Sequence, residues 1–172
     1  HEDAQNILNY AQPMQKPSQL VHVADLVNQV LGLADKQLQQ CGMKVIKDFE
    51  EVPPILAAPD SLMQVFLNMV INAVESCREF DSVLHIKLKS DNDHVCASFT
   101  TNGPTIPEKD LPYIFDPFFT TKPGGSGLGL WISRNLVEQY QGSLKANNLA
   151  DGEGVVFTVM FPGVMESAAI QS

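Results

Sequence analysis

The chain has 172 residues, of which 44% are hydrophobic, and a formal net charge of −9. This is enough for one core, in a domain of about 120 to 150 residues with attached ends, and too little for two full domains. The negative charge argues against a nucleic-acid surface, which requires clustered Lys and Arg, and no apolar run approaches the roughly 20 residues that cross a bilayer. We therefore expect neither a nucleic-acid partner nor direct membrane contact.

The first half of the chain alternates short strands with helices. Its predicted elements are a helix at 2–12, an edge strand at 21–23, a helix at 25–41, and strands at 45–49 and 55–57. Pro13 and Pro17 forbid continuation of the first helix, which we interpret as the end of a longer helix followed by a linker. Asp25 is expected to cap the second helix, and Gly42 to end it.

The second half adds more strands than helices. Its predicted elements are a helix at 60–80, strands at 84–89 and 95–99, a helix at 128–141, and strands at 143–148 and 155–161. Asp60 is expected to cap the first helix, and the first strand pair to form a hairpin across 91–93. This order predicts a two-layer α/β sandwich, in which three helices cover one face of a sheet. The other face, with His85, Lys87 and Lys89, should be solvated.

The three cysteines, Cys41, Cys77 and Cys96, are widely spaced and set in apolar surroundings. They indicate neither a disulfide framework nor a zinc site. The four histidines also lack the spacing of a metal site. This pattern fits a reducing cytoplasm, and the sequence leaves open whether the parent protein is anchored to a membrane.

The helix expected at 60–80 is apolar almost all round but carries one polar stripe. Every fourth residue is polar, in the series Gln64, Asn68, Asn72 and Ser76. These side chains could simply meet solvent. However, an amide left unpaired inside a core costs about 1 to 3 kcal/mol, so on a helix this apolar we expect the stripe to face a partner. Two amide oxygens one turn apart could face a magnesium ion together with nucleotide phosphates.

A glycine-rich segment precedes the last helix. Phe115, Phe118 and Phe119 lead through Lys122 into Gly124, Gly125, Ser126, Gly127, Leu128 and Gly129. Because glycines leave backbone N–H groups unshielded at the start of a helix, where the dipole is positive, the segment predicts an anion site with a lid. The phenylalanines fit either a lid anchor or simple core packing. Neither a dinucleotide-binding fingerprint nor a P-loop is present.

Four features follow one another along the chain: the asparagine-bearing helix, an Asn-Gly-Pro turn, the aromatic segment and the glycine-rich segment. With these features in this order, the chain resembles the ATP-binding catalytic domain of bacterial sensor histidine kinases, in the GHKL superfamily. The resemblance covers about residues 20–162. It implies a Bergerat-type fold with a mixed five-stranded sheet and three helices, and a lid at 116–126 that orders over ATP. Asn68 and Asn72 match the N box, 115–122 the F box and 125–130 the second glycine box.

The resemblance assigns roles residue by residue. Asn72 would be the magnesium ligand, and Asn68 and Lys122 would act in catalysis by orienting and steadying the phosphates. The full set expected to bind ATP is Asn68, Asn72, Thr101, Gly103, Thr105, Lys122, Ser126, Gly127, Leu128 and Gly129. In hydrolysing relatives an acidic base occupies the place of Asn68, and an amide is a poor base. Phosphoryl transfer to a protein side chain is therefore favoured over ATP hydrolysis.

The first glycine box departs from the family pattern. Thr101 stands where the family has the Asp that accepts from the adenine amino group, and Thr105 stands where it has a Gly. Because charged hydrogen bonds contribute about 1.5 to 3 kcal/mol and neutral ones about 1, Thr101 would weaken ATP binding by roughly 3-fold to 30-fold. Thr105 would add a second penalty, because a β-branched residue tolerates neither positive φ nor close backbone approach where the family uses Gly.

The expected function is that of a sensor histidine kinase catalytic domain, with ATP and Mg²⁺ as cofactors and with its own dimerisation and phosphoacceptor domain and a response regulator as partners. Residues 1–17 would be the end of the dimerisation helix and linker, 18–162 the catalytic domain and 163–172 a tail. The alternative is a degenerate module that binds ATP weakly or not at all and signals through protein contacts. A serine kinase of the anti-sigma-factor type shares the boxes, but the helix at 2–12 counts against it.

Overall fold

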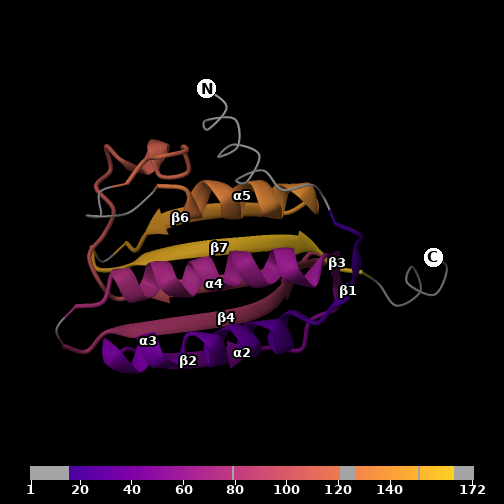
Figure 1. The fold of residues 1–172 in the computed structure, drawn as a ribbon, viewed down its shortest axis with the longest axis horizontal. Coiled ribbons are helices and arrows are strands. Elements are labelled where there is room, and N and C mark those ends of the chain that lie inside the picture. Colours follow the sequence, from indigo (N-terminus) through magenta and orange to yellow (C-terminus); the bar gives the residue numbers. More distant parts are fainter. Residues whose placement is uncertain (1–15, 79, 121–126, 151, 165–172) are drawn as a thin grey trace, which may run out of the picture.

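The structure, a computed structural model, describes residues 16–78, 80–120, 127–150 and 152–164 (Figure 1). The strands are β1 (Gln19–Val21), β2 (Lys44–Phe49), β3 (Ile55–Ala57), β4 (Val83–Asp91), β5 (His94–Thr101), β6 (Ser143–Asn148) and β7 (Val155–Pro162). The helices are α2 (Val23–Leu33), α3 (Asp35–Gln40), α4 (Pro59–Glu75) and α5 (Gly129–Gln139), with a short 3-10 helix, η1, at Leu111–Tyr113. No helix among these residues is both long enough and apolar enough to span a membrane.

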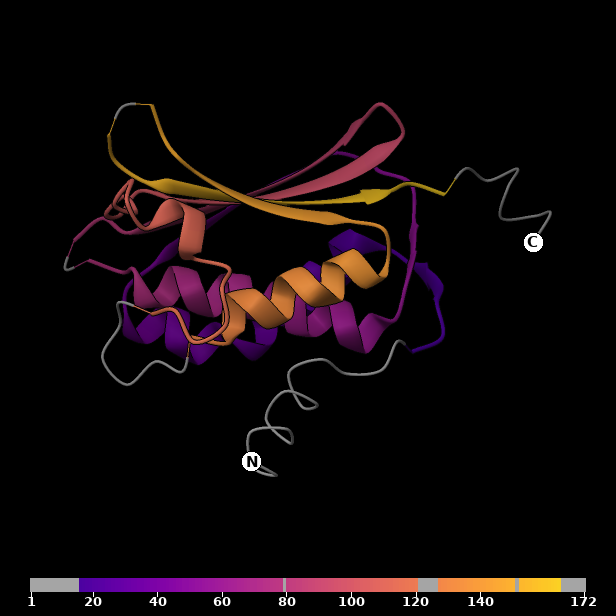
Figure 2. The same cartoon turned by 90° about the horizontal axis from the view of Figure 1, so that it is seen from above.

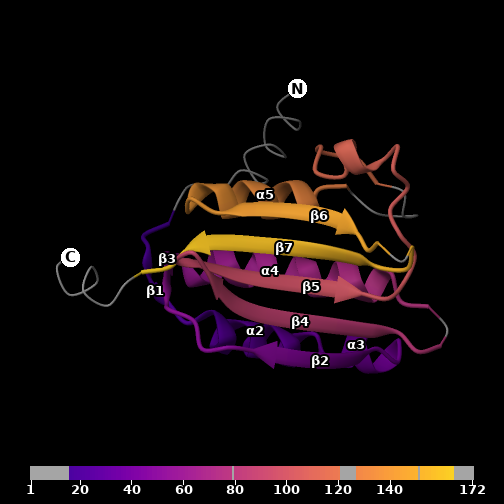
Figure 3. The same ribbon diagram turned by 180° about the vertical axis from the view of Figure 1, so that it is seen from behind.

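Five strands form one mixed sheet in the order β2-β4-β5-β7-β6 (Figure 3). Only β2 and β4 pair in parallel, and the other neighbours are antiparallel. The tight turn from β4 to β5 places Asn92 and Asp93 at positive φ, as a two-residue hairpin requires. The predicted mixed five-stranded sheet and this hairpin are confirmed.

All four helices lie on one side of the sheet (Figure 2). The alternating strand pattern explains this, because Leu84, Ile86 and Leu88 of β4 are buried beneath the helices while Lys87 and Lys89 are exposed on the other face. The centre of the core lies between α4 and β5, where the rings of Phe66 and Phe99 are 5.8 Å apart. The predicted two-layer sandwich with one solvated face is confirmed.

The helix expected at 25–41 is two helices, because the chain breaks at Ala34, whose φ and ψ are −94° and 5°. Gly32, a poor helix former, lies in the last turn before this break. The expected N-caps were also wrong, since Asp25 and Asp60 lie in the first turns of α2 and α4. There their charge still complements the helix dipole.

Helix α4 ends at Glu75, five residues before the expected boundary at 80. The Ser76 hydroxyl donates to the carbonyl of Ala73 at 2.8 Å and so competes with the next turn of the helix. Strand β1 also differs from its expected place at 21–23, because Val23 already begins α2. It pairs with β3 in a separate two-stranded ribbon.

The C-terminal end of α5 holds the chain where it enters the domain. The buried Tyr140 hydroxyl accepts from the backbone N–H of Lys16 and donates to the carbonyl of the same residue, both at 3.2 Å. The Lys16 ammonium also lies 3.8 Å from the exposed Asp60 carboxylate at the start of α4. Residue 16 is therefore fixed beside the ends of two helices.

Candidate functional site

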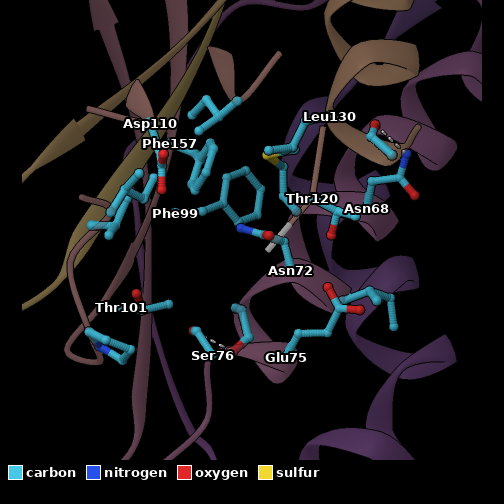
Figure 4. A pocket seen from close by; sticks show the side chains of 18 of the residues that line it. Asn68, Asn72, Glu75, Ser76, Phe99, Thr101, Asp110, Thr120, Leu130 and Phe157 are labelled. Carbon is cyan, nitrogen blue, oxygen red and sulfur yellow. Dashed lines mark hydrogen bonds between the residues drawn. The ribbon is translucent and has the colours of Figure 1, made fainter. Parts of the chain in front are cut away.

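A pocket of about 410 Å³ lies between α4, the ends of β5 and β7, and the start of α5 (Figure 4). Its volume is within the range of small-molecule sites. Its polar lining residues are Asn68, Asn72, Glu75, Ser76, Thr101, Thr105, Asp110 and Thr120. Apolar side chains, among them Phe99, Ile114 and Phe157, line the rest. This mixture suits a flat apolar group joined to a strongly polar one.

The polar stripe of α4 reaches this pocket for most of its length. Asn68, Asn72 and Ser76 line the wall, whereas Gln64 is exposed outside it. Figure 4 shows the amide of Asn72 pointing toward Phe99 and the amide of Asn68 pointing away from it. The direction of the Asn72 amide is therefore consistent with the expectation that it faces a ligand in the pocket. The direction of the Asn68 amide does not support the same expectation.

Asn68 instead ties α4 to the start of α5. Its Nδ2 donates to the Ser133 hydroxyl at 2.9 Å and to the Gly129 carbonyl at 3.2 Å. The Ser133 hydroxyl in turn donates to the same carbonyl at 2.8 Å. The three groups form a closed network that fixes where α5 begins relative to α4. That Asn68 also orients phosphates stays a prediction.

This network predicts the effect of Ser133→Ala. The Ser133 side chain is fully buried, so its removal deletes two hydrogen bonds without access of water. We expect the free energy of unfolding in urea to fall by about 1 to 2 kcal/mol. The exposed Ser90 offers a matched control, because Ser90→Ala should change that free energy by less than about 0.5 kcal/mol. Equal losses in the two variants would contradict a role for the network.

The start of α5 is held by a contact across the glycine-rich segment. The Phe118 N–H donates to the Gly127 carbonyl at 2.9 Å, so the chain on either side of 119–126 is joined at its base. Gly127 has φ +73°, and a Cβ there would lie 2.6 Å from Phe118 Cα. No side chain among the described residues caps α5 at Leu128, and Gly129 and Leu130 of its first turn line the pocket. Lys122 and Ser126, with Gly124 and Gly125, lie outside the described residues.

The three phenylalanines before this segment have different roles. Phe115 packs edge-on against Phe157 with ring centroids 6.4 Å apart, and the Arg134 guanidinium lies 4.8 Å from the centre of the Phe115 ring. Phe119 also packs against the core and lines the pocket, whereas Phe118 is exposed. Of the two interpretations left open by the sequence, core packing therefore holds for Phe115 and Phe119.

The altered glycine box borders the opposite wall. Thr101, the last residue of β5, is buried and lines the pocket. Gly103 approaches α4 closely, since a Cβ would lie 2.8 Å from the carbonyl oxygen of Ser76. Thr105 lines the pocket, but its φ is not positive. A penalty from positive φ at Thr105 is thus ruled out, because the chain reaches this wall in a conformation that β-branched residues tolerate.

Two asparagines, whose hydrogen-bond partners the sequence did not indicate, hold the loop between β5 and η1. The Asn148 amide accepts from the Ile106 N–H at 2.8 Å and donates to the Ile106 carbonyl at 2.7 Å. Asn102 accepts from the Val83 N–H at 2.9 Å and donates to the carbonyl of Asp81. No local pattern could have revealed these pairs, since each joins segments at least 19 residues apart.

The ionisable side chains that line the pocket, among the residues that the structure describes, are acidic. Glu75 and Asp110 are its ionisable side chains, and neither Lys nor Arg lines it among the residues that the structure describes. A bare triphosphate would therefore meet no described cation there. The carboxylate and amide oxygens are instead the donors that Mg²⁺ prefers, and the ion would offset phosphate charge. The residues present fit a metal-bound nucleotide.

Comparison with known proteins adds an independent observation. Residues 57–164 match the family described as histidine kinase-, DNA gyrase B-, and HSP90-like ATPase. The chain is 32% identical over 158 residues to the sensor histidine kinase ZraS of Salmonella typhi, covering 91% of this chain and 34% of that protein. It is 31% identical over 142 residues to sporulation kinase E of Bacillus subtilis, covering 82% of this chain and 19% of that protein. The chain thus spans about a third of the first of these relatives and about a fifth of the second.

Solved structures give the same result for the fold. The nucleotide-free catalytic domain of histidine kinase ThkA superposes with a TM-score of 0.77 at 28% identity, covering 86% of this chain and 97% of that one. A structure of ThkA in complex with the response regulator protein TrrA gives a TM-score of 0.78 at 26% identity, covering 94% of this chain and 46% of that one.

Proposed function

Because the chain belongs to the histidine kinase-, DNA gyrase B- and HSP90-like ATPase family, as a catalytic and ATP-binding domain of the sensor histidine kinase type, we propose that its pocket holds Mg-ATP and presents the γ-phosphate to a histidine on a separate domain. The observation that carries this proposal is that one pocket joins Asn72 of α4, Thr101 of β5 and the glycines at the start of α5. Each of the boxes named above that the structure describes contributes residues to that lining.

The proposed roles follow from position and chemistry. Thr101, on the wall formed by β5, would accept a hydrogen bond from the adenine amino group. Asn72 would hold Mg²⁺ through its amide oxygen. Backbone N–H groups at the start of α5 would bind phosphate oxygens, and Lys122 would add a cation. Bound Mg²⁺ supplies neutralisation of phosphate charge. The protein's own contribution is positioning, as in other phosphoryl transfers.

Transfer, rather than hydrolysis, is supported by what surrounds Asn68. An amide cannot deprotonate water, and its NH₂ group donates to Gly129 and Ser133. No carboxylate occupies the position of the general base of hydrolysing relatives. We propose that the acceptor is instead a histidine on the protein's own dimerisation domain, with residues 1–17 as the end of that domain and its linker and 163–172 as a tail.

A response regulator and a cytoplasmic location complete the proposal. The first is supported by the sensor kinase relatives and by the ThkA structure, which holds a response regulator. The second is supported by the three free cysteines. A degenerate, non-catalytic module is less well supported, because the pocket is open and Thr105 carries no backbone strain.

Titration of Mg-ATP into the chain by calorimetry tests the proposal. Thr101→Asp restores a charged acceptor on the pocket wall, so its affinity should exceed that of the unaltered chain by roughly 3-fold to 30-fold. Thr100→Asp is the matched control, because it adds the same charge one residue earlier, on the opposite face of β5. Heat from neither the unaltered chain nor Thr101→Asp, with both folded by thermal unfolding, would overturn nucleotide binding.

A further inference from the structure

Two cysteines that the proposed function does not use lie against each other. Cys41 ends α3, and Cys77 follows the end of α4. The Cys77 thiol donates to the Cys41 carbonyl oxygen at 3.2 Å, and the Cys41 thiol donates to the Leu38 carbonyl oxygen at 3.6 Å. The sequence had indicated no pairing, since 36 residues separate them. The fold brings them together because α3 and α4 end at the same edge of the helical layer (Figure 1).

Access and geometry both suit a covalent bond between these sulfurs. Cys41 and Cys77 are each partly exposed, whereas Cys96 is buried in β5. A disulfide requires two Cβ atoms about 4 Å apart, and the 3.2 Å contact between the Cys77 sulfur and the Cys41 carbonyl oxygen places the two residues side by side, so that rotation about χ1 can turn their sulfurs toward each other. A metal site is less suitable, because the described residues contain no group of three His, Cys, Asp or Glu that could hold an ion.

We propose that Cys41 and Cys77 form a reversible thiol–disulfide pair that is oxidised by small-molecule disulfides. In the first step a thiolate of the pair attacks the small disulfide, forming a mixed disulfide and releasing one small thiol. In the second step the other thiolate attacks the protein sulfur of that mixed disulfide and releases the second small thiol. Two protein thiols thereby lose two electrons and two protons, and one small disulfide becomes two thiols.

The order of the two steps follows from the environment of Cys41. Burial, and in addition the neighbouring Cys77 thiol, raise the pKa of Cys41 above its ordinary value. The raised pKa disfavours the Cys41 thiolate, and we therefore assign the first attack to Cys77. The inference does not rest on nucleotide binding. It does bear on the pocket, since the residue before Cys77 is Ser76, which lines the pocket and contacts Gly103.

The bond would also stabilise the domain. It closes a loop of 36 residues that contains β2, β3 and α4. Constraining a loop of this length in the unfolded chain should raise the midpoint temperature of unfolding, without reductant, by roughly 5 to 15 °C.

Incubation of the folded chain with oxidised glutathione tests the pair. The chain should lose two of its three free thiols and the mass of two hydrogen atoms, peptide mapping should link Cys41 to Cys77, and dithiothreitol should reverse the change. Cys96→Ser, the matched control, should still form the bond. Cys41→Ser should instead keep one glutathione on Cys77, because no second thiol can displace it.

Three results would overturn the proposal. Retention of all three thiols by the folded chain would show that the pair does not react. Glutathione that stays attached to Cys77 in the unaltered chain would show that Cys41 cannot complete the second step. A bond that includes Cys96 would show that oxidation followed unfolding, and the thermal midpoint of the same sample would confirm that reading.

Discussion

Gly127→Ala should lower the affinity for Mg-ATP by at least tenfold. A left-handed residue other than glycine costs about 1 to 2 kcal/mol, and Gly127 has φ +73°. The added Cβ would also overlap the main chain of Phe118 and break the hydrogen bond between the two residues, which costs about 1 kcal/mol more. The sum corresponds to roughly 30-fold to 150-fold in an equilibrium constant.

The measurement is calorimetric titration together with thermal unfolding, because the penalty can fall on either equilibrium. Gly32→Ala is the matched control, since a Cβ on Gly32 meets nothing within 4 Å and its place in α2 favours alanine. It should leave the affinity unchanged. If Gly127→Ala binds Mg-ATP as tightly as the unaltered chain and unfolds at the same temperature, the junction between Phe118 and Gly127 has no part in forming the site.

Asn72→Ala should lower the affinity for ATP by roughly 100-fold, and only when Mg²⁺ is present. Loss of groups that merely orient metal ligands typically weakens metal affinity by about 10-fold to 100-fold, and loss of a ligand should weaken it at least as much. Asn72→Asp retains an oxygen ligand and should lose less. The dissociation constants of Mg-ATP and of ATP with a chelator, compared in each variant, isolate the metal-dependent part.

Gln64→Ala provides the control for Asn72, because Gln64 belongs to the same polar stripe of α4 but is exposed outside the pocket. Its affinity should equal that of the unaltered chain in both titrations. An equal loss with and without Mg²⁺ in Asn72→Ala would show that Asn72 contacts the nucleotide or supports the wall. It would refute the assignment of Asn72 as a magnesium ligand.

Sequence periodicity predicted those parts of the fold that depend on near neighbours. Alternation along β4 indicated which face the helices cover, because successive side chains of a strand point to opposite faces. The spacing of Asn68 and Asn72 likewise placed both on one side of α4. Spacing could not determine which partner each amide takes. Asn68 bonds Ser133, 65 residues away, and only the packing of α4 against α5 sets that distance.

The features that the sequence did not indicate share this dependence on tertiary packing. Asn148 holds Ile106 and Cys77 meets Cys41 across separations of 42 and 36 residues. The break at Ala34 also escaped prediction, because the apolar spacing continues through it from Val30 to Leu38. For Thr105, the family pattern suggested a strained backbone that the loop does not require.

The two ends of α5 serve different neighbours. At one end Gly129 borders the pocket, and just beyond the other the Tyr140 hydroxyl holds both backbone groups of Lys16. The helix has 11 residues and is therefore roughly 16 Å long, a stiff rod on the scale of the domain. Because the helix is stiff, a tilt that moved its pocket end would also move residue 16, so α5 couples the pocket wall mechanically to the point where the chain enters the domain.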